Sequence, residues 1–255
     1  MVRFTRARLT TFTDPQYRAY VQRMTMSRDN QRATRPPRQR DLFGGEAEAL
    51  LRDWLTAQGL GLSERRILEY EERRDRSSIR KYRELDALVE APRALHVFEI
   101  KASRSASSLR RALGQLAEVR GALSLIAPQV TTTILLVDTG IPTAAEVLEL
   151  MRAPDAPHTP PPTLAEVLES QPKLVLIRSL TEITPGDDRV SVIRFSLDEL
   201  VALAGDRPLH LDWSADDDDP PPPPRTPTVH TIGDDTPDDD DDNPFAAAMR
   251  RVLKE

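Results

Sequence analysis

The sequence predicts an α/β protein in which a mixed sheet is flanked by helices. Two apolar, strand-like runs at 79–90 and 95–102 are close enough in the chain to form a hairpin. A helical pattern at 105–124 then leads to the β-branched run TTTILLVDT at 131–139, which is typical of a buried strand. A helix between two strands indicates a crossover connection, which is right-handed if the strands are parallel.

The other elements are predicted from local patterns. Apolar residues three and four apart before Gly59 predict a helix over 44–59. Thr143 with Glu146 three residues later predicts a capping box at the start of a helix over 143–152. The core order is then helix, three strands, helix, strand (αβββαβ). The remaining predicted elements are a strand at 64–71, a helix at 163–169, strands at 172–180 and 189–196 that extend the sheet or form an interface, and a helix at 196–205.

Composition limits the class of protein. The chain has 255 residues and no cysteine, which excludes disulfides and thiolate zinc sites and fits a reducing cytoplasm. We see no signal peptide at the N-terminus, and no apolar run approaches the ~20 residues of a membrane span. The four histidines have no ligand spacing, and neither a nucleophile elbow nor a Walker loop is present. We therefore expect a cytoplasmic protein without a membrane contact.

Charge divides the chain into four parts. Residues 1–41 are predicted to be a basic, weakly structured arm, since ten arginines face two aspartates over residues 1–40. Residues 42–205 are predicted to form the folded domain, with its core at 44–139. Residues 206–242 are predicted to be a disordered linker rich in aspartate and proline, and residues 243–255 a short amphipathic helix.

The two C-terminal parts leave two hypotheses open. The helix at 243–255 could dock in a groove of a protein partner. The acidic linker could instead fold over a basic site in the same chain and inhibit it, because acidic tails repel or mimic phosphate backbones. The sequence is also compatible with a homodimer.

Asp86 and Glu99 are the strongest candidates for a functional site. If the hairpin turn is centred between Pro92 and Arg93, position 86 lies opposite position 99, and Lys101 shares a face with Glu99. Two carboxylates that face each other across a hairpin repel, and a divalent cation between them removes that cost. The pattern therefore indicates a hard-metal site beside an ammonium group, which suits the hydrolysis of a phosphodiester.

These residues resemble the motif of the PD-(D/E)xK nuclease superfamily, which has the restriction-endonuclease-like fold. Asp86 matches the first carboxylate of the motif, and Glu99-Ile100-Lys101 matches (D/E)xK. Glu48 in Gly44-x-x-x-Glu48 resembles a helix glutamate of the family, and Gln115 resembles the helix glutamine that comes after the motif. The resemblance covers residues 44–139.

The resemblance implies a role for each of these residues. Asp86 and Glu99 would hold Mg²⁺, with Mn²⁺ as a substitute, and the carbonyl of Ile100 would be a third oxygen ligand. Lys101 would orient or deprotonate the attacking water and offset negative charge at the phosphorus. Two residues would assist: Glu48 would complete the metal shell directly or through water, and Gln115 would position the phosphate or the lysine.

The implied activity is that of a Mg²⁺-dependent nuclease, acting on DNA in preference to RNA, in defence or genome maintenance. The alternative is a module of the same fold that binds nucleic acid or a partner in a larger complex without cutting. A toxin-like or scaffolding subunit is a third hypothesis. The arginines predicted to contact a phosphate backbone are Arg104, Arg110, Arg111 and Arg80.

Overall fold

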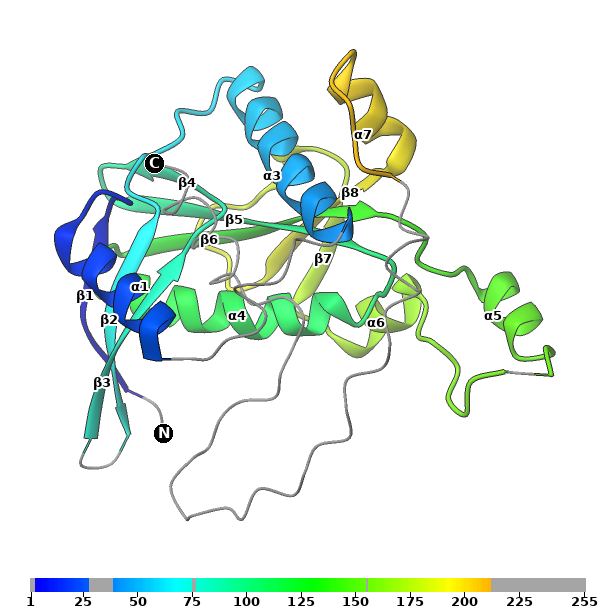
Figure 1. Cartoon of the computed structure of the whole chain (residues 1–255), viewed down its shortest axis with the longest axis horizontal. Helices are drawn as coiled ribbons and strands as arrows, with labels where there is room; N and C mark the ends of the chain where they lie inside the picture. The colour runs from blue at the N-terminus through cyan, green and yellow to red at the C-terminus, as the bar shows by residue number, and fades with distance from the viewer. Residues whose placement is uncertain (1–2, 28–38, 75–76, 155, 212–255) are drawn as a thin grey trace.

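The structure is a computed structural model that describes residues 3–27, 39–74, 77–154 and 156–211. Its centre is a five-stranded mixed sheet (Figure 1). The first two strands pair antiparallel as a hairpin, and the other neighbours pair parallel. In sheet order the strands are β4 (Ala87–Ala91), β5 (Ala94–Ser103), β6 (Gln129–Asp138), β8 (Val190–Ser196) and β7 (Leu174–Ile177).

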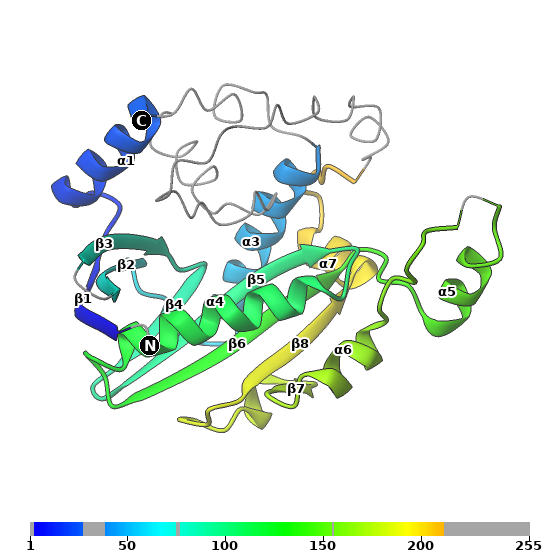
Figure 2. The same ribbon diagram turned by 90° about the horizontal axis from the view of Figure 1, so that it is seen from below.

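Helices cover both faces of this sheet, so the predicted fold class is confirmed. In Figure 1, α3 (Gln39–Ala57) and α7 (Leu197–Ala204) lie above the sheet, and α4 (Ser108–Leu123) and α6 (Leu164–Ser170) lie below it. Helix α5 (Ala144–Leu150) projects from the sheet in Figures 1 and 2 and has no buried residue. Among the described residues, no helix is long and apolar enough to cross a membrane.

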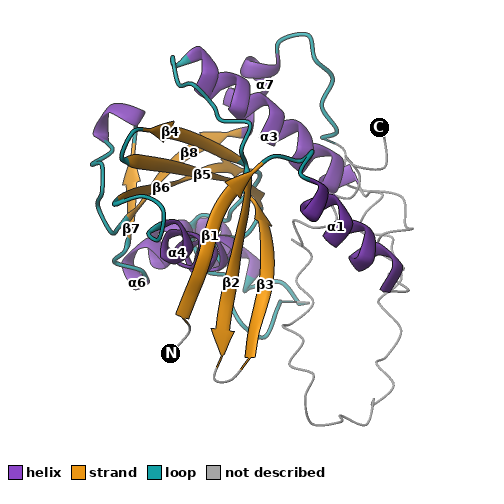
Figure 3. Ribbon diagram, turned by 90° about the vertical axis from the view of Figure 1, so that its left-hand side faces the viewer, coloured by secondary structure: helices purple, strands orange, loops and turns teal. Residues whose placement is uncertain are grey.

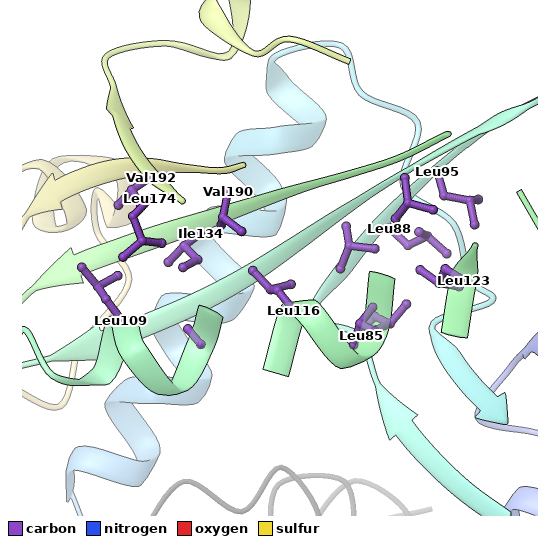
Figure 4. Packing of buried hydrophobic residues seen from close by; sticks show 14 of the residues in the cluster. Leu85, Leu88, Leu95, Leu109, Leu116, Leu123, Ile134, Leu174, Val190 and Val192 are labelled. Carbon is purple, nitrogen blue, oxygen red and sulfur yellow. The ribbon is translucent and has the colours of Figure 1, made fainter. Parts of the chain in front are cut away.

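The alternation of side chains along the strands makes two cores. On the α4 face, Leu95 and Val97 of β5 belong to the same buried cluster as Leu109 and Leu116 of the helix. Figure 4 shows Leu95, Leu109 and Leu116 in this cluster. On the opposite face, the even-numbered residues of β5 pack against α3 and α7. The sheet is therefore buried on both sides, as expected for its largely parallel strands.

A second, antiparallel sheet has the order β1-β2-β3 and lies beside α4 (Figure 3). Its strands are β1 (Arg3–Thr10), β2 (Ile67–Arg74) and β3 (Ser77–Glu84). The hydroxyl of Tyr70 on β2 donates a hydrogen bond to Glu118 of α4. Phe4 of β1 packs against Gly121 of the same helix.

The prediction of a weakly structured arm is wrong for residues 3–27. They form β1 and helix α1 (Pro15–Ser27). Arg6 and Arg8 of β1 pair with Glu71 and Glu69 of β2. Tyr17 of α1 is buried against β2 and β3. Charges that resemble a solvated arm in the sequence are therefore cross-strand pairs.

The predicted strand at 79–90 is also wrong, because it is two strands in different sheets. β3 ends at Glu84 in the second sheet, and β4 begins at Ala87 in the central sheet. The chain changes sheets at Leu85 and Asp86, whose carbonyl oxygens both accept hydrogen bonds from the side chain of Arg66. The candidate carboxylate therefore lies at a junction, outside the regular strand.

The other predicted elements are present with shifted ends. Helix α3 begins at Gln39, before the predicted start at residue 44, and β2 runs to Arg74. The Thr143–Glu146 capping box is confirmed. The strands at 172–196 extend the sheet, as β7 and β8, with the short 3₁₀ helix η1 (Leu180–Glu182) between them. The expected acidic linker beyond Leu211 and the expected helix at 243–255 lie outside the described residues.

Two glycines of α4 provide a test of the contact between α4 and the second sheet. A Cβ added at Gly121 would lie 2.7 Å from Phe4 Cε2, whereas a Cβ at Gly114 would meet nothing within 4 Å. We expect Gly121→Val to lower the free energy of unfolding by about 1–3 kcal/mol through overpacking. Gly114→Ala should raise it by about 0.5–1 kcal/mol, since alanine favours a helix interior. Urea denaturation of both variants measures this, and equal effects at the two positions would contradict the contact.

Candidate functional site

The register of the β4–β5 hairpin brings the predicted site together. Ala91 pairs with Ala94 and Ala87 with Phe98, so the next position in the same register sets Asp86 opposite Glu99. This is the register that the sequence predicted. Side chains alternate along a strand, so Glu99 and Lys101 share the α4 face of β5 with Val97. The site lies where β4 begins and β5 ends, at the edge formed by the carboxyl ends of the parallel strands.

Asp86 is fixed to the neighbouring strand by its own carboxylate. Oδ2 of Asp86 accepts a hydrogen bond of 2.6 Å from the backbone N–H of Ile100. Burial raises the pKa of Asp86 well above its ordinary value, and the nearby carboxylates of Glu99 and Glu48 raise it further. Lys101 and the Ile100 N–H act in the opposite direction. The surroundings of Asp86 therefore disfavour its ionised form, and Lys101 and the Ile100 N–H offset only part of that effect.

Lys101 and Glu99 form an ion pair within the site. Nζ of Lys101 lies 3.0 Å from Oε1 of Glu99, and both side chains are largely buried, with 17% and 11% of their surface exposed. A strand places residues two apart on the same face, which explains why a single residue separates the two partners. The ammonium group is thus next to both predicted metal-binding carboxylates.

Arg66, which the sequence did not single out, holds the junction between β3 and β4. Its side chain is 7% exposed, and Nη1 donates to the carbonyl oxygens of Leu85 at 3.1 Å and Asp86 at 2.8 Å. The guanidinium also lies over the ring of Phe12, 4.9 Å from its centroid. Arg52 of α3 makes a longer contact of 3.4 Å with the Asp86 carbonyl. Two arginines therefore fix the main chain of Asp86, while Ile100 fixes its side chain.

Glu48 is brought to the same place from the other face of the sheet. It lies on α3, and its Oε1 is 3.6 Å from Nη1 of Arg66 and 4.0 Å from Nη1 of Arg52. Arg66 is also 3.8 Å from Glu84 at the end of β3. The structure thus joins Glu48 to the site through arginines, a link that the sequence did not predict. Its predicted role as a metal ligand remains a hypothesis.

Gln115 lies on α4, the helix that covers the face bearing Glu99 and Lys101. Its Oε1 is fully buried and has no hydrogen-bond partner among the described residues. A buried amide oxygen without a partner costs free energy, so a donor from a bound molecule or water would be favourable there. The predicted role of Gln115 in positioning the phosphate or Lys101 remains a hypothesis.

Three of the four predicted phosphate-binding arginines lie near one another in the chain and are exposed. Arg104 comes after β5, and Arg110 and Arg111 belong to the start of α4, whose first turn contains no acidic residue. The fourth, Arg80, lies on β3, and its Nε is 3.4 Å from Glu69. The alternation of β3 places it with Tyr82 on the face away from α4.

The donor set of the site fits a hard divalent cation. Carboxylate and carbonyl oxygens, as offered by Asp86, Glu99 and Ile100, are the ligands that Mg²⁺ prefers. The raised pKa of Asp86 indicates an acidic cluster that a cation would stabilise. In the described part of the chain, however, no three histidine, cysteine or acidic side chains already stand in a metal-binding arrangement. Because Lys101 pairs with Glu99 at 3.0 Å, a cation at Glu99 would compete with this ion pair.

Comparisons of the chain with protein-family models, curated proteins and solved structures found no match.

Arg66 provides a test of the junction. We expect Arg66→Met to lower the free energy of unfolding by about 3–5 kcal/mol, because it removes the buried cation between Glu48 and Glu84 and the donor to the Leu85 and Asp86 carbonyl oxygens. The neighbouring Arg65 is a matched control: its side chain is 56% exposed and pairs with Glu90, so Arg65→Met should cost no more than about 1 kcal/mol. Chemical denaturation of both variants decides the matter. Equal losses would show that Arg66 has no special structural role.

His96 provides a test of burial in the sheet. It stacks on Phe98 and shares a 2.9 Å hydrogen bond with Thr133, and burial lowers its pKa to about 4. Below about pH 6.5 the unfolded chain binds a proton at this residue that the folded protein does not, so stability falls until about pH 4, by at most roughly 3 kcal/mol. His96→Leu should abolish this part of the acid loss, and His158→Leu, at an exposed position, should preserve it. Thermal unfolding at several pH values measures both, and parallel curves for His96→Leu and wild type would refute the assignment.

Proposed function

We propose that this chain is a metal-dependent nuclease of the PD-(D/E)xK type. One observation carries the proposal: the β4–β5 register sets Asp86 opposite Glu99, with Lys101 3.0 Å from Glu99 on the same face of the sheet. Two carboxylates and an ammonium at the carboxyl edge of the sheet are the groups that phosphodiester hydrolysis requires. The order of elements around the site, with α3 before the hairpin and α4 and β6 after it, is compatible with the proposed restriction-endonuclease-like core.

In this proposal, Asp86 and Glu99 hold Mg²⁺ or Mn²⁺, together with the carbonyl oxygen of Ile100. The cation supplies Lewis acidity to the phosphate ester. Lys101 leaves Glu99 and contacts the substrate phosphate. Its positive charge there offsets the negative charge that develops on the phosphoryl oxygens. Since Arg66 and Arg52 already contact Glu48, we assign to Glu48 an indirect role through water or charge.

The orphan oxygen of Gln115 and the exposed arginines extend the proposal to substrate binding. Gln115 Oε1 can accept a hydrogen bond from Lys101 or from a water that a phosphate orients. Arg104, Arg110 and Arg111 can contact a phosphate backbone that approaches the carboxyl edge. DNA is preferred over RNA on the resemblance alone, as is a role in defence or genome maintenance.

A nucleic-acid-binding module that does not cut is the second candidate. The three exposed arginines favour it, because phosphate contacts by arginine require no catalytic group. The two candidates differ in what the carboxylates do: a binding module needs no cation, and its affinity for DNA would not depend on Asp86.

The proposal predicts metal-dependent cleavage that needs Lys101. Linear, circular and single-stranded DNA are incubated with Mg²⁺, Mn²⁺ or EDTA. Lys101→Ala should reduce cleavage by roughly 10²–10⁴-fold, the usual contribution of a positioned acid–base group. Asp86→Asn should reduce it similarly by removing a metal ligand. Lys173→Ala is the matched control, since this exposed lysine precedes β7, away from the site.

Cleavage by wild type and Lys173→Ala, but not by the two site variants, would support the nuclease assignment. Unchanged cleavage by Lys101→Ala would refute it. DNA binding by wild type without any cleavage would favour the second candidate.

A further inference from the structure

The described part of the chain ends beside α3, the helix that carries Glu48. After α7, residues 205–211 run back along α3. Nη1 of Arg207 lies 2.7 Å from Asp53, and three residues later the backbone N–H of His210 donates to Glu46 at 2.9 Å, while its ring contacts the same carboxylate. The segment contacts Asp53 first and then Glu46, which comes earlier in α3. It therefore runs towards the N-terminal end of that helix.

The middle of α3, which the segment reaches at Glu46, also contributes to the site. Glu48 is two residues from Glu46 and is one of the carboxylates that act on Asp86. Arg66 connects the two, with contacts of 3.6 Å to Glu48 and 2.8 Å to the Asp86 carbonyl. The chain beyond Leu211 therefore continues from a point beside Glu46, two residues from Glu48 on α3.

The sequence beyond Leu211 is strongly acidic. Residues 212–242 contain twelve aspartates and a single basic residue, Arg225. Fully extended, these residues span at most about 100 Å, which is ample to reach the start of α4. Arg104, Arg110 and Arg111 are exposed there, in the loop after β5 and the first turn of α4. We call these three residues the arginine rim.

The acidic segment and the arginine rim belong to the same chain, and this linkage strengthens the attraction between their opposite charges. A linked segment acts at an effective concentration in the millimolar range for short flexible linkers. Opposite charges attract without strong screening over about 8 Å at physiological salt. An acidic segment anchored at Glu46 thus competes with any polyanion that approaches the same arginines.

We propose that residues 212–242 of this chain occupy the arginine rim and compete there with a nucleic-acid phosphate backbone. The docking itself depends only on charge and on the anchor at Glu46. The identity of the competitor rests on the proposed function.

The first experiment tests docking without any assay of activity. Since the chain has no cysteine, Thr236→Cys and Ala117→Cys give one spin label in the acidic segment and one on the exposed side of α4. The distance distribution between the labels is measured in the full chain. We expect a short-distance population that is lost in about 1 M salt, where the Debye length falls to about 3 Å.

The matched variant replaces the nine aspartates of Asp216–Asp219 and Asp238–Asp242 by asparagine, which keeps the length of the segment. It should lose the short-distance population. The control variant replaces Pro220–Pro224 by serine, which keeps every charge, and it should retain that population. A broad distribution in wild type that neither salt nor the asparagine variant alters would overturn the proposal, whether or not the protein cuts DNA.

The second experiment measures binding of a DNA oligonucleotide in EDTA. The asparagine variant should bind about tenfold more tightly than wild type at low salt, and the difference should shrink as salt rises, because both interactions are electrostatic. Equal affinity of the two proteins at low salt would overturn the competition. Docking of the segment without any DNA binding would leave the internal contact standing and reject nucleic acid as its competitor.

Discussion

The antiparallel register of β4 and β5 is the constraint on which the candidate site depends. With Ala87 paired to Phe98, the chain just before β4 must lie beside Glu99, and Asp86 is the residue at that position. A shift of one residue would turn Glu99 and Lys101 towards α3 and place Phe98 and Ile100 on the α4 face. The hydrogen bond from the Ile100 N–H to Asp86 then continues the pairing through a side chain after the regular ladder has ended.

This placement carries an electrostatic cost that the surrounding residues reduce. The carboxylates of Glu99, on β5, and Glu48, on α3, both act on the buried Asp86 just before β4. Lys101 compensates Glu99, and Arg66 compensates Glu48 while it holds the main chain of Asp86. Local rules of stability are most often broken at functional sites, where the arrangement is selected for binding or chemistry. The cluster of carboxylates at the carboxyl edge of this largely parallel sheet breaks such a rule, because it brings like charges together.

The parts of the fold that depend on local pattern could be predicted from the sequence. The hairpin register is set by the turn at Pro92-Arg93 and the period of two along a strand, and the capping box of α5 by Thr143 and Glu146. Contacts between distant parts of the chain could not be predicted. β1 is a strand because it pairs with β2, some sixty residues later, which its arginine-rich sequence does not reveal. Likewise, Arg66 resembles any charged residue before a strand, and its role depends on carbonyl groups about twenty residues away.

The most direct test of the account is whether a divalent cation binds between Asp86 and Glu99. Crystals of the protein soaked in Mn²⁺ would be measured at the manganese absorption edge, and anomalous difference maps calculated for wild type and Asp86→Asn. The account predicts one strong peak in wild type, in contact with both carboxylates and absent from the variant. Well-diffracting wild-type crystals with no peak at these residues, or a peak that persists in the variant, would contradict it.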